Sequence, residues 1–232
     1  MNTLITTPPL DVFEHMALDE YLVRVRPGAV ALRFYNWTLG PAVTFGYAQF
    51  ISEVRRALNE QRFSGSYARQ PTGGGVVFHT DDLTFSLVFT SPAKPAEIYK
   101  NLHSAIFTQL QKGGLAGAVF EKALPAAAYA PSVNHEANAC FIRPVENDLL
   151  AADGQKMLGG AIRRFGQTVL YQGSLQQPGA RTNPLFKRAV IEGVHQFLAV
   201  DLHPMACAPE DLTAAKELAR TQYHTPGWTE KF

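Results

Sequence analysis

The chain has 232 residues, of which 46 % are apolar and 18 % charged, and its formal net charge is +1. This composition excludes a mainly disordered chain and predicts a single domain over residues 1–232 with one sizeable core. The balanced charge gives no indication of a nucleic-acid or membrane partner. Two cysteines are too few for a disulfide framework, no signal peptide or membrane-spanning stretch is recognisable, and we expect a cytoplasmic protein.

The first predicted element is an amphipathic helix over 13–25, ended by Pro27 and Gly28. Its apolar residues share one face, and Asp19, Glu20 and Arg24 fall off that face. A turn near Gly40–Pro41 separates the first two strands, and the third and fourth flank a glycine triplet in a hairpin-like segment. These strands are predicted over 30–35, 42–47, 66–69, 76–79 and 83–89.

In the second half, a helix over 98–110 is followed by an Ala- and Pro-rich loop at 123–130. Asp153–Gly154 is a strong tight-turn signal and predicts a hairpin. The remaining predicted elements are strands at 148–152, 155–158 and 168–174 and helices at 185–198 and 211–220. Many hairpins and few regular strand–helix–strand alternations favour an α+β fold over a doubly wound sheet.

The segment Arg69–His79 contains three consecutive glycines, Gly73–Gly75. Glycines reach positive φ and let a ligand lie against the backbone, and the Val-Val-Phe that follows supplies an apolar wall. The spacing fits neither a phosphate-binding P-loop nor a dinucleotide fingerprint. A bulged strand or a tight hairpin is the structural alternative.

Lys156 lies just past the predicted turn and leads into Gly159–Gly160–Ala161, where small residues leave room beside a charge. An ammonium placed on a developing oxyanion stabilises the transition state by a few kcal/mol. The alternative is an ordinary surface lysine on a hairpin. Cys140 precedes Lys156, and a nearby cation would lower the pKa of its thiol and favour a nucleophile, whereas a buried structural cysteine is the alternative. No metal-ligand spacing is present.

These segments together resemble the superfamily of lipoate-protein ligases, octanoyltransferases and biotin ligases. Arg69–His79 is similar to the family pattern Arg-Arg-x-Thr-Gly-Gly-Gly-x-x-x-His. The second half of the family's sequence pattern looks like Lys156-x-x-Gly-x-Ala161 and Gln172-Gly-Ser-Leu175 of this chain. The pair Asn147–Asp148 is also typical of the family. The resemblance covers most of the chain.

The resemblance implies a mixed, largely antiparallel sheet flanked by helices, related to class II aminoacyl-tRNA synthetases. It implies Lys156 as the catalytic contact to the activated acyl group, His79 as a residue that closes the site, and, in the cysteine-type transferases, Cys140 as the acyl carrier. The implied substrate- and nucleotide-binding residues are Arg69, Thr72, Gly73, Gly74, Gly75, Val76, Val77, Phe78, His79, Asn147, Asp148, Gly159, Gly160 and Ala161.

The leading expectation is attachment of a lipoyl or octanoyl group to a lysine of a lipoyl-domain acceptor, a 2-oxoacid dehydrogenase subunit or a glycine cleavage H-like protein. The ligase route uses lipoate, ATP and Mg to form an acyl-adenylate. The alternatives are an octanoyltransferase that takes its acyl group from acyl carrier protein through a Cys140 thioester, a non-catalytic acyl-binding homologue, and a biotin ligase.

Three departures from the family pattern matter. Gln70 replaces the second arginine, which removes a phosphate contact and puts ATP use in question. Tyr171 stands where a histidine often precedes Gln-Gly-Ser. The accessory C-terminal domain of the larger ligases is not expected, because the sequence runs to Phe232.

Overall fold

The computed structural model describes residues 2–37, 39–121 and 144–232. Its main sheet has eight strands, in which β11, β1 and β2 are mutually parallel and the remaining pairings are antiparallel. In spatial order the strands are β11 (His203–Ala206), β1 (Thr3–Thr6), β2 (Ala31–Phe34), β6 (Leu83–Thr90), β10 (Thr168–Leu175), β9 (Lys156–Phe165), β8 (Leu149–Ala151) and β7 (Gly117–Val119). The predicted α+β class and its largely antiparallel mixed sheet are confirmed.

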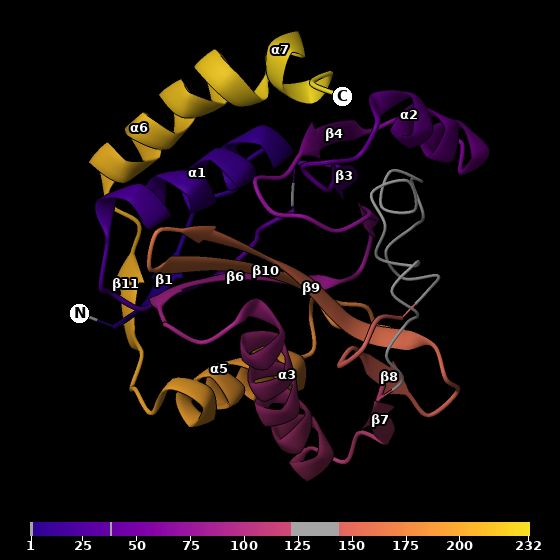
Figure 1. Cartoon of the computed structure of the whole chain (residues 1–232), viewed down its shortest axis with the longest axis vertical. Helices are drawn as coiled ribbons and strands as arrows, with labels where there is room; N and C mark the ends of the chain where they lie inside the picture. Colours follow the sequence, from indigo (N-terminus) through magenta and orange to yellow (C-terminus); the bar gives the residue numbers. More distant parts are fainter. Residues whose placement is uncertain (1, 38, 122–143) are drawn as a thin grey trace.

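Helices cover both faces of this sheet (Figure 1). On one face lie α1 (Val12–Val25) and α6 (Pro209–Leu218), and on the other lie α3 (Pro95–Lys112) and α5 (Pro184–Leu198). The largest apolar cluster joins α3 and α5 to the central strands, and burial of this surface is the main term that stabilises the fold. A π-helical turn, η2 (Ala219–Tyr223), and the short α7 (Pro226–Thr229) follow α6. No helix among the described residues is long and apolar enough to cross a membrane.

A second, three-stranded sheet stands beside the end of α1 (Figure 1). Its middle strand β3 (Ala42–Phe45) pairs in parallel with β4 (Ser66–Arg69) and antiparallel with β5 (Val76–His79). The expectation that the strands flanking the glycines form a hairpin is therefore wrong, because β3 lies between them. The strands around Gly40–Pro41 do not pair either, since β2 and β3 belong to different sheets.

The predicted helices at 98–110, 185–198 and 211–220 appear as α3, α5 and α6, and the hairpin at Asp153–Gly154 joins β8 to β9. The sequence reading missed α2 (Ile51–Glu60) and the short strands β1, β7 and β11. The predicted loop at 123–130 lies outside the described residues.

Two acidic residues of α1 do not lie where the helical pattern put them. Asp19 and Glu20 were expected off the apolar face, yet both are buried. Asp19 pairs with the buried Arg33 and accepts a hydrogen bond from Tyr35. Glu20 accepts one from Tyr223. Buried carboxylates are tolerated when they are paired in this way, and a count of apolar positions does not reveal such partners.

Candidate active site

A narrow cavity lies between the small sheet and the main sheet, with a volume of about 410 Å³ including its open mouth. Strands β9 and β10 form its floor, and β3, β5 and the glycine segment form its roof, with α1 and Tyr35 at one end. The residues that line it are Met16, Tyr35, Thr44, Gln70, Gly74, Val77, His79, Thr84, Gly159, Gly160, Ala161, Gln172, Gly173 and Ser174.

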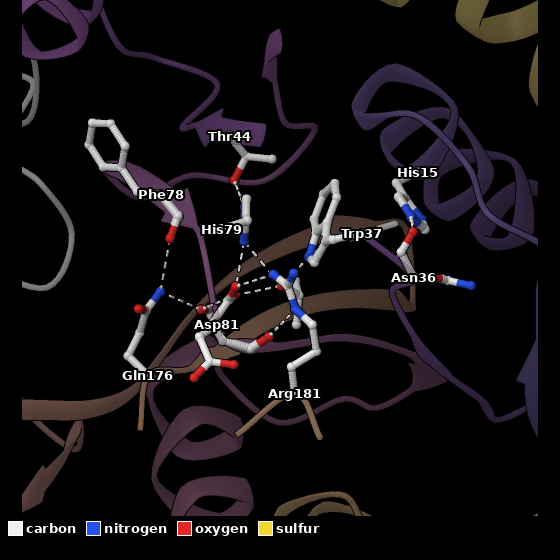
Figure 2. Close-up of polar contacts among 12 residues, drawn as sticks. His15, Asn36, Trp37, Thr44, Phe78, His79, Asp81, Gln176 and Arg181 are labelled. Atoms are coloured by element: carbon white, nitrogen blue, oxygen red, sulfur yellow. Dashed lines mark hydrogen bonds and ion pairs between the residues drawn. The ribbon is translucent and has the colours of Figure 1, made fainter. Parts of the chain in front are cut away.

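His79 belongs to the wall, and both of its ring nitrogens are engaged. Nε2 lies 3.0 Å from Thr44 Oγ1, and Nδ1 lies 2.9 Å from the buried carboxylate of Asp82. Figure 2 shows this ring between Thr44 and the polar cluster that Arg181 borders. Asp82 also accepts hydrogen bonds from the hydroxyls of Thr84 and Ser174. Burial would raise the pKa of Asp82, but the neighbouring His79 and the two hydroxyls outweigh it and lower that pKa to about 2.

Gln172 and Tyr35 form a second engaged cluster. The Gln172 amide donates to Asp19 at 2.8 Å and to the Tyr35 hydroxyl at 2.9 Å. Its oxygen accepts a 2.6 Å hydrogen bond from Thr72. Across the described residues, no buried side-chain nitrogen or oxygen in the cavity wall lacks a hydrogen-bond partner. The polar groups satisfy one another and leave an interior suited to an apolar chain, because a buried ligand polar atom would find few partners there.

The glycine segment bends at Gly74, the one member of the triplet with positive φ (+96°). The glycine segment packs closely against Gly46, which follows the last residue of β3. A Cβ at Gly46 would collide with the Gly74 carbonyl. Gln70, which replaces the family's second arginine, folds back, and its amide donates to the Gly73 carbonyl. Of the three glycines, Gly74 is the one whose backbone lines the cavity.

Strand alternation decides which residues of this segment reach the cavity. Val77 and His79 line it. Val76 packs in a separate apolar cluster behind the small sheet, and the Phe78 ring lies 5.8 Å from that of Phe63. The predicted Val-Val-Phe wall is thus reduced to Val77.

Arg69 is buried away from the cavity, although it was expected to bind substrate or nucleotide. Its guanidinium donates to the carbonyls of Tyr47 (2.6 Å), Gln49 (2.8 Å), Trp228 (2.9 Å) and Thr229 (2.8 Å). Burial lowers the pKa of Arg69 to about 10, so it remains charged at neutral pH. Its described contacts give it a structural role: it ties the roof to the C-terminal segment.

Lys156 is buried, with its side chain only 2 % exposed, so the surface-lysine alternative is wrong. Its ammonium lies 2.8 Å from Asp148 Oδ2 and packs against Gly159 of the cavity floor, where a Cβ would collide with the lysine side chain. Asp148 is fully buried. Burial raises its pKa, against the opposing effects of Lys156 and the Tyr99 hydroxyl. The structure thus brings Lys156, Asp148, Gly159, Gly160 and Ala161 together.

Asn147 precedes Asp148 in a tight turn with φ of +69°, and it borders a groove beside the cavity. This groove shares Gly74, Gly160 and Ala161 with the cavity. Sequence reasoning missed several residues of the site: Met16, Tyr35, Thr44, Asp82 and Tyr99. The predicted nucleophile Cys140 lies outside the described residues.

The cavity is thus roofed by a glycine loop, and Lys156 packs behind Gly159 of its floor. The lipoyl protein ligase A/B catalytic domain model matches residues 11–179, and the chain belongs to this family. Octanoyltransferase LipM of Halalkalibacterium halodurans is 26 % identical over 268 aligned residues, which cover 92 % of this chain and 93 % of that protein. Octanoyltransferase LipM of Symbiobacterium thermophilum is 33 % identical over 176 aligned residues, which cover 70 % of this chain and 60 % of that protein.

Solved structures agree on the fold. Protein Ta0514 of T. acidophilum with bound lipoic acid has a TM-score of 0.76 at 20 % identity, covering 100 % of this chain and 98 % of that chain. Lipoate-protein ligase A bound with ATP has a TM-score of 0.76 at 21 % identity, covering 99 % of each. A bipartite lipoate protein ligase from Thermoplasma acidophilum, studied with its E2 lipoyl domain, has a TM-score of 0.73 at 20 % identity. The match covers 99 % of this chain and 96 % of that chain. With the family, these findings establish an acyl-transferring enzyme of the lipoyl and octanoyl class.

Proposed function

We propose that this enzyme attaches an octanoyl or lipoyl group to a lysine of a lipoyl-domain acceptor protein. The observation that carries the proposal is the placement of the Lys156 ammonium against Gly159, at the floor of a cavity whose polar atoms are already paired. The alkyl chain lies in the cavity, and its carbonyl lies beside Lys156. There the ammonium stabilises the negative charge that develops on the carbonyl oxygen.

The same pairing of polar atoms disfavours biotin. Its ureido ring carries two N–H donors and a carbonyl, which need buried partners. In the cavity wall, the Gln172 side chain already binds Asp19 and Thr72. The His79 ring already binds Thr44 and Asp82. An octyl or dithiolane-bearing chain makes no comparable demand.

For the donor, we favour an acyl thioester over ATP. Among the described residues, neither the cavity lining nor the groove beside it contains an arginine, and the lysine behind the floor is Lys156. Lys156 is paired with Asp148, and Arg163 donates to the Pro71 carbonyl. A triphosphate with Mg²⁺ needs several cations or carboxylates around it, and these residues fit it poorly. The octanoyltransferase relatives support the same choice.

The proposed donor is octanoyl-acyl carrier protein, and the proposed nucleophile is Cys140. The Cys140 thiolate attacks the donor thioester, the carrier thiol leaves as the new thioester forms, and the neutral amine of the acceptor lysine then attacks. The amide bond forms as the Cys140–acyl bond breaks, and the amine proton leaves to solvent. The acceptor is a 2-oxoacid dehydrogenase subunit or a glycine cleavage H-like protein.

The test is incubation of the enzyme with octanoyl-acyl carrier protein, without acceptor, followed by intact-mass analysis. A mass increase of one octanoyl group that is absent in Cys140→Ala supports the route, whereas normal transfer by Cys140→Ala refutes it. Cys207→Ala is the matched control, because Cys207 is buried in another cluster. A parallel reaction with lipoate, Mg-ATP and a lipoyl domain examines the ligase route, which the ATP-bound structural neighbour keeps as the second candidate.

A further inference from the structure

Helix α3 carries two polar residues, Tyr99 and His103, whose contacts the sequence does not show. They lie one turn apart, their rings are 4.0 Å apart between centroids, and both face the turn that bears Asn147 and Asp148. Helix α3 therefore places polar side chains next to Asp148, the residue whose carboxylate pairs with Lys156.

The Tyr99 hydroxyl joins this carboxylate to the floor of the cavity. It donates to Asp148 Oδ1, and it accepts a 2.9 Å hydrogen bond from the backbone nitrogen of Gly160. Asp148 Oδ2 accepts from the backbone nitrogen of Val145 at 2.6 Å and binds Lys156 at 2.8 Å. Each carboxylate oxygen is thus committed, and only one orientation of the carboxylate satisfies all of these partners.

His103 supports the same turn from behind. Burial, with the nearby Lys156 charge, lowers the pKa of His103 to about 3, so its ring is neutral. Because the Asn147 carbonyl can only accept a hydrogen bond, the Nδ1–H of His103 donates to it at 2.8 Å. The Nε2 of His103 then accepts a hydrogen bond from the Tyr171 hydroxyl at 2.7 Å. Tyr171 thus belongs to the same buried cluster, where its hydroxyl donates to His103.

We propose that Tyr99 is a positioning residue for catalysis: its hydroxyl holds Asp148, and through it the Lys156 ammonium, in line with the Gly159–Gly160 floor where the acyl carbonyl lies. This inference rests on the role of Lys156 in the proposed function. Tyr99 does not hold the acyl chain in the cavity, so its hydroxyl acts on the rate of the chemical step rather than on affinity. Small displacements of a charge-stabilising group are enough to slow a reaction greatly.

The test compares Tyr99→Phe with Tyr171→Phe, which also removes one buried hydroxyl from this cluster. Urea unfolding measures the stability of both, isothermal calorimetry measures octanoate binding, and transfer from octanoyl-acyl carrier protein to a lipoyl domain gives kcat and KM. In Tyr99→Phe, kcat should fall about 10- to 100-fold, with KM and octanoate affinity unchanged. Tyr171→Phe should lose comparable stability and keep kcat within a few-fold.

An equal fall of kcat in both variants, or an unchanged kcat in Tyr99→Phe, would overturn the inference, because the hydroxyl would then be structural only. Tyr99→Leu is a second hydroxyl-free variant if the phenylalanine variant does not fold. Failure of the proposed function is separate: it shows as absence of transfer by the wild-type enzyme, whatever the variants do.

Discussion

Thr72 donates a 2.6 Å hydrogen bond to the side-chain oxygen of Gln172, which lies 100 positions further along the chain. This bond joins the glycine segment of the roof to strand β10 of the floor. Because both groups are buried, the bond is protected from competition by water. It fixes the height of the cavity at the end where Met16 and Tyr35 close it.

Thr72→Val should therefore destabilise the enzyme by about 1–3 kcal/mol, because the Gln172 oxygen is left buried without its donor. Thr72→Ser keeps the hydroxyl and should lose much less. Urea unfolding at neutral pH measures the difference. Equal midpoints for the two variants would show that the hydroxyl does not carry this stability.

Lys156→Ala should cost stability as well as rate, because Lys156 forms a buried ion pair with Asp148. Removing the ammonium leaves the Asp148 carboxylate buried and uncompensated, which destabilises by roughly 3–5 kcal/mol. The double variant Lys156→Met with Asp148→Asn should recover most of this stability, because no net charge is left behind. It should stay inactive in octanoyl transfer, and this would separate the catalytic role of the ammonium from its structural role.

Gly159→Ala tests the position of the ammonium without removing it. The new Cβ would occupy the space of the Lys156 Cε and Nζ, which form the flexible end of the side chain and can move. We expect kcat to fall about 100-fold, with a smaller loss of stability than in Lys156→Ala, because the ammonium is still present to pair with Asp148. Gly154→Ala is an exposed-turn control at a positive φ of +81°. It should cost some stability and leave kcat unchanged; a kcat loss equal to that in Gly159→Ala would argue against displacement of Lys156.

Asp82 should contribute stability that depends on pH in a defined window. Its pKa is about 2 in the folded enzyme and about 3.9 in an unfolded chain. The depressed pKa means that the contribution, about 2 kcal/mol, is complete above about pH 4 and is lost as the pH falls through about 2. The stability difference between wild type and Asp82→Asn, measured by urea unfolding at successive pH values, should shrink across that window. A difference that does not vary with pH would contradict this assignment.

Met16 borders the cavity at the end where Gln172 lies, with its sulfur 3.5 Å from the Gln172 amide. A bulkier residue there should shorten the space for the chain. Met16→Trp should raise KM for octanoyl donors more than for butyryl donors, and Met16→Leu, of similar volume, should leave the ratio near that of the wild type. Competition between donors of two lengths measures this ratio directly.

The features that depend on local sequence were predictable, although the roles of the predicted site residues stay predictions. Three consecutive glycines, a tight Asp-Gly turn and a lysine before small residues each impose a local geometry, and their order matched one family. The single domain over 1–232 and the chemical role of Cys140 stay predictions.

What could not be predicted depends on contacts between distant segments. Tyr99 and His103 lie on a helix whose apolar spacing is complete without them, so nothing in α3 alone marks them as partners of Asn147 and Asp148. The pairing of strands in the small sheet could not be predicted either. The chain passes through α2 after β3 and returns as β4 on one side of β3, while β5 pairs on the other side. Arg69 matched the family motif, but its carbonyl partners lie as far away as Thr229.

The Arg69 contacts also bear on how the enzyme matures. Trp228 and Thr229 supply carbonyls to a guanidinium that lies 159 and 160 positions earlier, and the Trp228 ring nitrogen returns a hydrogen bond to the Arg69 backbone. Contacts of such high sequence separation form late in folding. A nascent chain that has not yet reached Trp228 holds Arg69 without these acceptors, so the roof should become ordered only after Trp228 and Thr229 have been synthesised, and the acyl cavity should stay unable to capture substrate before then.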